Sequence, residues 1–588
     1  MEIKQIKDLW GHLSIERKKQ FYHLIFFILL GAISEFISIG LLIPFIAALS
    51  NPDIIVSYSQ YKFFFNIFSA YNKENFIGIA FIFLAFASVL AGFIRIMLIR
   101  KTSQFSYNAG ADLNLAIYKK ILSQNFDQHL GSNKTLLIDL VINKTKLIVT
   151  GLIYPLITIL SSIVMIIFIL ILLLLLSPKI TFFSLALITF AYFIVTKYCR
   201  INLKNNSELI SKKSSSLITF MQESLGSIRD IILSNSHQKF YNKFSEINLP
   251  VQKAESDILI VGQSPKYLIE SFGMVLLAFI ALFLIKASTN RDQIIVTIGV
   301  MALSAQRLLP LVQNIYFGIT SARGVGMSLN DILSALKKPI KQFPDSKTIK
   351  NLKFNKAIVL KNITYRYPNE EKDAFNNINL KINQGDCVGI IGDSGCGKST
   401  LLDLIMGLTT PSYGEIYIDG KKLTKRNLQH WQKNISHVPQ NIFLINESIK
   451  KNITFLSEGD YVDYDLLDKV CNVAQLKNFV GISLDGIKKE VGDRGDKVSG
   501  GQKQRIGLAR AMYKEPTVFI LDEATSALDP KLERRIIQSI YEAYHKCTII
   551  MVTHRKATLT NCNKIFKLEG KKIITIRSDK KKYGPKKL

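Results

Sequence analysis

One short stretch decides how the C-terminal part of the chain folds: Gly392-Asp393-Ser394-Gly395-Cys396-Gly397-Lys398-Ser399-Thr400. The apolar run 387–391 before it is typical of a buried strand, and the run 401–408 after it is typical of a helix. A glycine-rich loop in this context, closed by Lys-Ser-Thr, is the pattern of a P-loop. Its backbone N–H groups and the following helix N-terminus attract phosphate oxygens. The stretch therefore predicts a nucleotide-binding α/β domain.

Two further apolar runs supply polar groups that suit ATP chemistry. Lys398 is expected to reach the outer phosphates, while the Ser399 hydroxyl ligates Mg²⁺. The predicted strand 517–521 ends at Asp522, an expected Mg²⁺ holder, and at Glu523, which is placed to polarise an attacking water. A third strand, 548–553, ends at His554, which is placed to contact the γ-phosphate, although a lone histidine is more often structural. We expect ATP and Mg²⁺ as cofactors.

Residues 355–570 resemble the nucleotide-binding domain of the ABC superfamily, whose motifs occur here in order. The resemblance implies that Tyr367 stacks on adenine and that Gln440 senses Mg²⁺. Val498-Ser499-Gly500-Gly501-Gln502 resembles the signature motif, with Val in place of the commoner Leu. The other family segments are Glu490–Gly495, which in exporters touches the coupling helices, and Ser526–Asp529, the D-loop. The implied catalytic residues are Glu523, His554 and Gln440; the implied Mg²⁺ residues are Ser399, Gln440 and Asp522; and the implied ATP contacts are Tyr367, Gly392, Asp393, Ser394, Gly395, Cys396, Gly397, Lys398, Ser399, Thr400, Ser499, Gly500, Gly501 and Gln502.

The resemblance also implies a second copy of the chain. In the family, ATP lies between the P-loop of one subunit and the signature motif of the other. One chain carries one set of motifs, so we expect a homodimer with two composite sites. Because Glu523 and His554 are both present, we expect both sites to hydrolyse ATP.

The N-terminal part has the composition of a membrane domain. The chain is 48% hydrophobic, with a mean hydropathy of +0.20, although its net charge is +30. Its apolar residues gather in stretches long enough to cross about 30 Å of hydrocarbon: 21–49, 76–99, 148–176, 180–198, 266–286 and 293–320. The predicted fold is a six-helix membrane domain (1–335), a linker (336–354) and a cytoplasmic α/β P-loop ATPase domain (355–588) with a basic tail.

The distribution of Lys and Arg predicts the orientation. The first twenty residues and the long polar segments 100–146 and 199–257 are rich in both, whereas the loop 50–75 holds only Lys62 and Lys73. The positive-inside rule then places both termini on the cytoplasmic side of the membrane. The family resemblance implies the inner membrane of a bacterium. We expect anionic membrane lipid and not nucleic acid to be the partner of the positive charge, and the six cysteines to be reduced thiols.

Charges inside the apolar stretches are candidates for a transport site, because they are costly in lipid. These are Glu35, Arg95, Lys266, Glu270 and Arg307. One interpretation is that Arg95, Lys266 and Arg307 form a cationic cavity wall for an anionic headgroup. The other is that Arg95 and Lys266 extend to the interface, or that Glu270 neutralises one of them. The aromatic residues of the loop 58–71 are interpreted as an interfacial belt or as a short helix that touches a lipid tail.

The order of domains resembles the bacterial multidrug and lipid exporters, with coupling helices expected near 125–134 and 225–233. Ser264–Glu270 and Gln306–Pro310 resemble the PglK-like flippases of lipid-linked oligosaccharides. The resemblance implies a polyprenyl-pyrophosphate-linked oligosaccharide as the anionic substrate. Alternatives are export of another lipid, such as a lipopolysaccharide precursor, or of hydrophobic drugs, and an ATP-gated channel or regulator.

Overall fold

The computed structural model describes residues 3–50, 73–176, 178–287, 291–339, 354–367, 370–455, 462–477, 484–553, 555 and 558–577. The chain divides into two compact units. The first contains residues 1–124 and 132–341, and the second contains 125–131 and 342–588. The first unit is built from helices and the second is an α/β unit.

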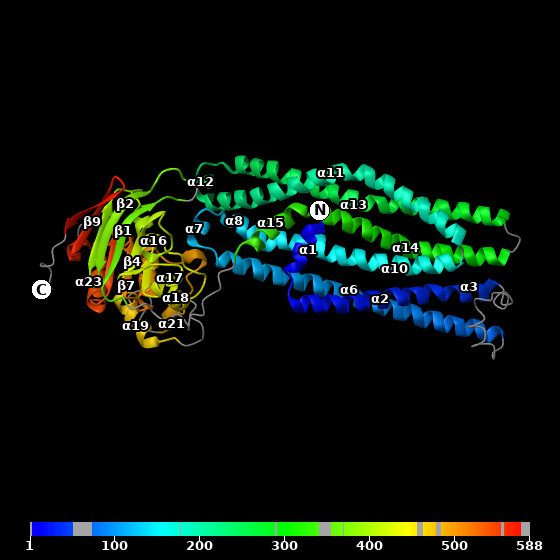
Figure 1. Ribbon diagram of the computed structural model, residues 1–588, viewed down its shortest axis with the longest axis horizontal. Helices are drawn as coiled ribbons and strands as arrows, with labels where there is room; N and C mark the ends of the chain where they lie inside the picture. Colours follow the sequence, from blue (N-terminus) through cyan, green and yellow to red (C-terminus); the bar gives the residue numbers. More distant parts are fainter. Residues whose placement is uncertain are drawn as a thin grey trace. The chain divides into compact units, whose positions relative to one another are not determined.

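The helical unit contains long helices joined by short ones (Figure 1). Its elements are α1 (Ile3–Gly11), α2 (Ile15–Gly40), α3 (Leu42–Ser50), α6 (Lys73–Leu122), α8 (Lys134–Asp139), η2 (Leu140–Lys144), α9 (Thr145–Ile148), η3 (Val149–Ile153), α10 (Tyr154–Leu176), α11 (Pro178–Gly226), α12 (Ile228–Leu233), α13 (His237–Ala287), α14 (Arg291–Gly324) and α15 (Gly326–Lys337). Both η segments are π-helical turns, which the sequence did not predict. Helix α12 lies inside the predicted coupling segment 225–233.

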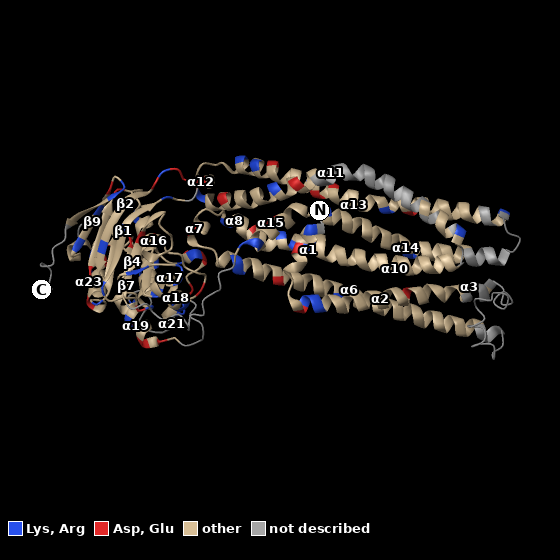
Figure 2. Cartoon of the chain, in the orientation of Figure 1, with Lys and Arg blue, Asp and Glu red and all other residues tan. Residues whose placement is uncertain are grey.

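The long polar segments are continuations of the apolar helices. Helices α6, α11 and α13 are 50, 49 and 51 residues long, so each extends far beyond the length that a bilayer needs. Within the described residues, four helices are long and apolar enough to cross a membrane: Ile15–Gly40, Ile77–Leu122, Lys134–Leu175 and His237–Leu282. In Figure 2 the charged residues gather on the parts of α11 and α13 near α12, while the parts of α2, α6 and α10 near α3 are almost uncharged.

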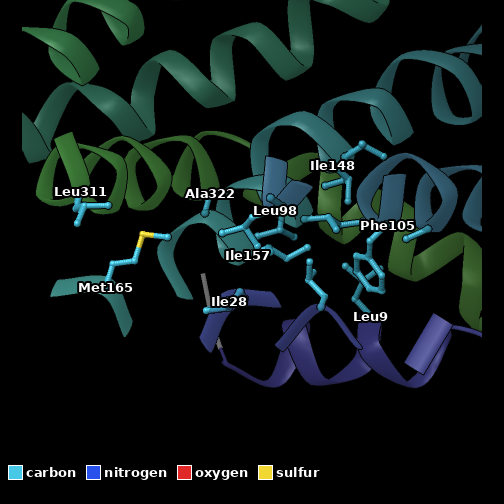
Figure 3. Close-up of a cluster of buried hydrophobic side chains, with 14 of the residues drawn as sticks. Leu9, Ile28, Leu98, Phe105, Ile148, Ile157, Met165, Leu311 and Ala322 are labelled. Atoms are coloured by element: carbon cyan, nitrogen blue, oxygen red, sulfur yellow. The ribbon is translucent and has the colours of Figure 1, made fainter. Parts of the chain in front are cut away.

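A continuous apolar core holds the helices together. Helix α2 packs on α6 and α10, α10 packs on α14, and α13 packs on α11 and α14. The buried side chains of this core come from α1, α2, α3, α6, α9, η3, α10, α14 and α15. Figure 3 labels nine of them: Leu9, Ile28, Leu98, Phe105, Ile148, Ile157, Met165, Leu311 and Ala322. The core thus connects segments that are about three hundred residues apart in the chain.

The α/β unit has two sheets. The first is antiparallel, in the order β2-β1-β4-β5, and the second has the order β10-β9-β3-β8-β7-β6, with all pairs parallel except β9 with β10. The strands are β1 (Ala357–Tyr365), β2 (Phe375–Asn383), β3 (Cys387–Gly392), β4 (Tyr413–Ile418), β5 (Lys421–Lys422), β6 (Ile435–Val438), β7 (Val518–Asp522), β8 (Thr548–Val552), β9 (Lys564–Glu569) and β10 (Lys572–Arg577). The helices are α7 (Phe126–Leu130), α16 (Lys398–Met406), α17 (Leu428–Gln432), α18 (Ile449–Thr454), α19 (Tyr464–Val473), α21 (Leu484–Ile487), η4 (Asp493–Gly495), α22 (Gly500–Met512), α23 (Pro530–Ala543) and η5 (Thr558–Asn561).

The parallel sheet brings the predicted chemistry to one edge. Strands β3, β8 and β7 are neighbours and run in the same direction, so their carboxyl ends meet. The P-loop follows β3, Asp522 is the last residue of β7, and Thr553 follows β8. Alternating burial is absent from β7 and β8, where every residue is buried, because helices cover both faces of such a sheet.

Close helix packing in the helical unit yields a test at Gly110 on α6. A Cβ added there would clash with Cγ2 of Val149, whose β-branched side chain has little freedom to move. Gly92, on the same helix, has nothing within 4 Å of the corresponding position. We expect Gly110→Ala to destabilise the unit by about 1–3 kcal/mol through overpacking. Thermal unfolding of the purified protein in detergent measures this, and Gly92→Ala should leave the midpoint unchanged or raise it. Equal midpoints for the two variants would contradict the packing at Gly110.

Candidate functional site

The P-loop has the conformation that its glycines permit. Gly395 and Gly397 have φ values of +79° and +98°, which residues with a Cβ rarely adopt. Gly397 is the N-cap of α16, so the unpaired N–H groups of the first helical turn face the loop. The side chain of Lys398 is nearly buried and its Nζ donates to the carbonyl oxygens of Gly392 (2.9 Å) and Asp393 (2.8 Å). The ammonium group of Lys398 therefore lies beside the P-loop, whose backbone N–H groups are the expected phosphate donors.

Ser399 and Asp522, the two residues expected to hold Mg²⁺, are in direct contact. Oγ of Ser399 donates to Oδ2 of Asp522 over 3.0 Å. Burial raises the pKa of Asp522, and the adjacent Glu523 carboxylate raises it further, while the hydrogen bond from Ser399 opposes both. A hydroxyl and a partly buried carboxylate beside a phosphate cradle are hard oxygen donors, which Mg²⁺ prefers. The residues present therefore fit a magnesium ion.

Glu523 is held in an unusual backbone conformation. Its φ is +46°, and its backbone N–H donates to the carbonyl oxygen of Val552 over 3.0 Å. Nε2 of Gln440, from the loop after β6, donates to Oε2 of Glu523 over 2.8 Å. Two of the predicted catalytic residues are thus in direct contact. Their partner in the prediction, His554, lies outside the described residues.

The predicted adenine contact, Tyr367, and the signature motif both form hydrogen bonds within the α/β unit. Oη of Tyr367 is hydrogen-bonded to Oγ1 of Thr400 in the P-loop helix. Ser499 caps α22 through a capping box, in which its Oγ accepts from the N–H of Gln502 and its own N–H donates to Oε1 of Gln502 over 2.8 Å. Gly500 and Gly501 form the first turn of α22, whose N-terminus attracts phosphate. The motif therefore places the N–H groups of Gly500 and Gly501 at the start of a capped helix.

Sequence analysis missed Gln504, which anchors the D-loop. It is 5% exposed on α22, its Nε2 donates to Oγ of Ser526 (3.1 Å), and its Oε1 accepts from the N–H of Ala527 (2.9 Å). The signal that points to it is a polar residue on the buried side of a helix directly after the signature glycines. Gln504 couples the signature helix to the segment that follows Glu523.

A second missed residue is Asp403 on α16, which is influenced electrostatically by Asp522 and by Asp127 of α7. Helix α7 belongs to the α/β unit and falls inside the predicted coupling segment 125–134. Its Asp127 accepts a hydrogen bond from Oη of Tyr365 over 3.3 Å. Burial raises the pKa of Asp403 to about 6, with further contributions from the carboxylates of Asp522 and Asp127. A line of carboxylates thus leads from Asp522 to α7.

The helical unit contains a cavity of about 740 Å³. Arg95 and Arg307 both line it, but Lys266 does not. In this chain the expected trio is therefore a pair, and Nζ of Lys266 instead lies 5.6 Å from the ring centre of Tyr267. The remaining lining residues are Leu98, Ile99, Thr102, Thr150, Tyr154, Pro155, Thr158, Ser161, Ser162, Met165, Gln306, Pro310, Leu311, Asn314, Phe317 and Gly318. The aromatic segment 58–71 lies outside the described residues.

Known proteins resemble both parts of the chain. Residues 21–307 match the family model described as "ABC transporter transmembrane region". Residues 375–526 match a second family model, described as "ABC transporter". A structure of a bacterial Atm1-family ABC exporter with ATP bound superposes with a TM-score of 0.73 at 18% identity, covering 95% of this chain and 94% of that one. This likeness confirms the predicted fold class, a transmembrane exporter domain fused to an α/β nucleotide-binding domain.

Curated relatives match less than half of the chain. ABC transporter B family member 2 of Dictyostelium discoideum is 37% identical over 39% of this chain and 16% of its own length. Multidrug resistance protein pgp-1 of Caenorhabditis elegans is 32% identical over 44% of this chain and 19% of its own length. The leukotoxin translocation ATP-binding protein LktB of Mannheimia haemolytica is 34% identical over 42% of this chain and 35% of its own length. The chain thus spans little more than a third of these relatives at most.

The raised pKa of Asp403 predicts a pH-dependent stability. An unfolded Asp loses its proton near pH 3.8, but the folded Asp403 holds it to about pH 6. Its stabilising contribution is therefore complete below pH 3.8 and is lost as the pH rises through about 6. We expect Asp403→Asn to raise the unfolding midpoint more at pH 7.5 than at pH 5. Fluorescence of the buried Trp431 in a Trp10→Phe background reports on this unit.

The matched control for this measurement is Asp465→Asn, on the exposed surface of α19. It should show no such increase between pH 5 and pH 7.5. A gain from Asp403→Asn that is the same at both pH values would contradict the assigned environment of Asp403.

Proposed function

We propose that this chain, a member of the ABC transporter superfamily, is a half-transporter that works as a homodimer and uses ATP to flip a polyprenyl-pyrophosphate-linked oligosaccharide from the cytoplasmic to the outer leaflet. The membership rests on the two matched regions and the shared exporter fold. The substrate and the direction are our own assignment. They rest chiefly on two arginines that line one cavity inside the helical unit.

The ATP site supports a hydrolytic cycle. Lys398 and the P-loop backbone would bind the phosphates, and Ser399 and Asp522 would hold Mg²⁺, which neutralises phosphate charge when bound. Glu523 would accept a proton from the attacking water, and the contact from Gln440 orients its carboxylate. We assign His554 to the γ-phosphate as well. The signature residues Ser499–Gln502 would complete the site of a second copy of the chain, which makes the functional unit a homodimer.

The cavity supports an anionic lipid as the substrate. The side chains of Arg95 and Arg307 are 33% and 47% exposed, so both guanidinium groups face open space. Arginine binds phosphate oxygens through parallel N–H donors. A diphosphate has several oxygens that can accept these hydrogen bonds. Hydroxyl and amide groups on the cavity wall suit a saccharide: Thr102, Thr150, Thr158, Ser161, Ser162, Gln306 and Asn314. Lys266 does not line this cavity, so we assign the headgroup to Arg95 and Arg307.

The second candidate is an exporter of hydrophobic drugs or of another lipid. The Caenorhabditis elegans relative is named a multidrug resistance protein, and LktB is named for leukotoxin translocation. The apolar part of the cavity wall, which includes Leu98, Met165 and Phe317, would accept such molecules. The two partly exposed arginines of the cavity wall favour the pyrophosphate lipid, because an uncharged drug offers them no negative charge.

For the placement in the cell, we propose the cytoplasmic membrane of a bacterium, with both termini on the cytoplasmic side. The membrane domain would comprise residues 1–335 and the linker 336–354, and the ATPase domain would comprise residues 355–588. Helix α12 would serve as the second coupling helix, as α7 serves as the first.

The role of Glu523 can be tested directly. We expect Glu523→Gln to lower the ATPase rate about 100-fold or more, because a general base contributes about 10²–10⁴-fold, while binding of a fluorescent ATP analogue is kept. Glu542→Gln, on the surface of α23, is the matched control and should keep the full rate. Normal hydrolysis by Glu523→Gln would remove Glu523 from the assigned role.

The substrate class is tested by stimulation of the ATPase in reconstituted membranes. We expect undecaprenyl-pyrophosphate oligosaccharide to raise the rate at least about twofold, since substrates bias the cycle toward closure. The uncharged polyprenol and hydrophobic drugs should have a smaller effect. Stimulation by drugs or lipid A, but not by the pyrophosphate lipid, would favour the second candidate.

A further inference from the structure

The two cavity arginines share one carboxylate. Oε1 of Glu35, on α2, lies 2.5 Å from Nη2 of Arg95 on α6 and 3.3 Å from Nε of Arg307 on α14. The Glu35 side chain is only 3% exposed, whereas both arginines are partly open. Glu35 is not among the residues that line the cavity. The buried Glu35 carboxylate therefore pairs with two arginines that line the cavity, although Glu35 itself does not line it.

This cluster is held by charge more than by geometry. Among the described residues, Oε1 of Glu35 has no aligned hydrogen-bond donor despite the short distances to both guanidinium groups. A guanidinium has five N–H donors in a planar fork, so an arginine near one carboxylate oxygen still has donors for a second anion. The cluster carries two positive charges and one negative charge. It is therefore incompletely neutralised on the side of the cavity.

We propose that Glu35 is an internal counter-ion that an anionic headgroup must outcompete, and that it makes the cavity selective for a diphosphate over singly charged phospholipids. Glu35 is a specificity-determining residue that acts through Arg95 and Arg307. The inference rests on the proposed pyrophosphate-lipid substrate. It goes beyond that proposal, because it assigns a role to a carboxylate that would repel the substrate.

The physical reason is the composition of the surrounding lipid. Two arginines without a counter-ion are costly at membrane depth and would attract any anionic headgroup. A phospholipid with one negative charge offers them little more than Glu35 already provides. A diphosphate carries more charge and more acceptor oxygens, so it gains enough from both arginines to overcome the repulsion by Glu35. Glu35 also weakens the final complex, which permits release.

The test compares binding of two lipids to the full-length protein in nanodiscs, with undecaprenyl pyrophosphate and phosphatidylglycerol as probes. Removing the negative charge in Glu35→Gln should tighten binding of phosphatidylglycerol about tenfold, the scale of one nearby charge. Binding of the pyrophosphate lipid should tighten less, because its extra contacts already dominate, so that selectivity falls. In flipping assays the variant should release the pyrophosphate lipid more slowly than wild type.

Two further variants separate this role from a structural one. Glu35→Asp keeps the charge and should keep most of the selectivity. Glu246→Gln removes an exposed carboxylate from α13 that is outside the cavity lining, and should bind both lipids as wild type does. Should Glu35→Gln fold poorly, the Glu35→Gln/Arg95→Gln pair, which removes one charge of each sign, replaces it and should lose the preference for the diphosphate.

The outcomes for the inference and for the proposed function are distinct. If wild type prefers the pyrophosphate lipid and Glu35→Gln keeps the same selectivity, Glu35 has no role in specificity while the proposed function stands. If wild type shows no preference for the pyrophosphate lipid, both proposals are wrong. Loss of selectivity in Glu35→Gln together with its retention in Glu35→Asp supports the counter-ion.

Discussion

A polypeptide in lipid has no water to satisfy its backbone N–H and C=O groups or to solvate its charges, and the helical unit is organised by this constraint. Continuous helices such as α6, α10 and α13 satisfy the backbone N–H and C=O groups within each segment. The charges meet this constraint by pairing, and the pairing of Glu35 with Arg95 and Arg307 draws α2, α6 and α14 toward one cavity. The ion-paired cluster and the cavity wall thus involve the same two arginines.

The α/β unit faces a different constraint, which is to gather several oxygen donors and one lysine around phosphate. Parallel strands solve it by bringing their carboxyl ends to one edge, where Ser399, Asp522 and Glu523 meet. The short segment 125–131 belongs to this unit, although the residues on either side of it in the chain belong to the helical unit. Burial raises the pKa of Asp403, and the carboxylates of Asp522 and of Asp127 in this segment raise it further.

Much of this architecture could be predicted from local sequence. Strand β3, the P-loop and the positions of Asp522 and Glu523 follow from short apolar runs that end in polar residues. The direct contacts of Ser399 with Asp522 and of Gln440 with Glu523 agree with the roles that family resemblance implied. Local patterns carry this information because the residues of each motif lie close together in sequence or at the end of one strand.

The rest depends on contacts between distant segments, which no local pattern encodes. The sequence shows Glu35 as a charge in an apolar stretch, but it does not show its partners. Arg95 lies 60 residues and Arg307 lies 272 residues further along the chain. Lys266 has the same local pattern as the two arginines and yet does not line the cavity, because α13 presents it elsewhere. Asp403 and Gln504 look like ordinary polar residues of helices until the fold places them beside Asp522 and Ser526. The π-helical turns η2 and η3 likewise carry no sequence signature that we could use.

The central claim is that ATP hydrolysis by this chain moves a pyrophosphate-linked lipid across the membrane. It is tested most directly in proteoliposomes, by measuring how much polyprenyl-pyrophosphate oligosaccharide becomes accessible to a glycan-modifying enzyme on one side after addition of ATP. The account predicts translocation by wild type, none by Glu523→Gln, and a strong reduction in Arg307→Ala. Full ATP hydrolysis without any translocation of this lipid would contradict it.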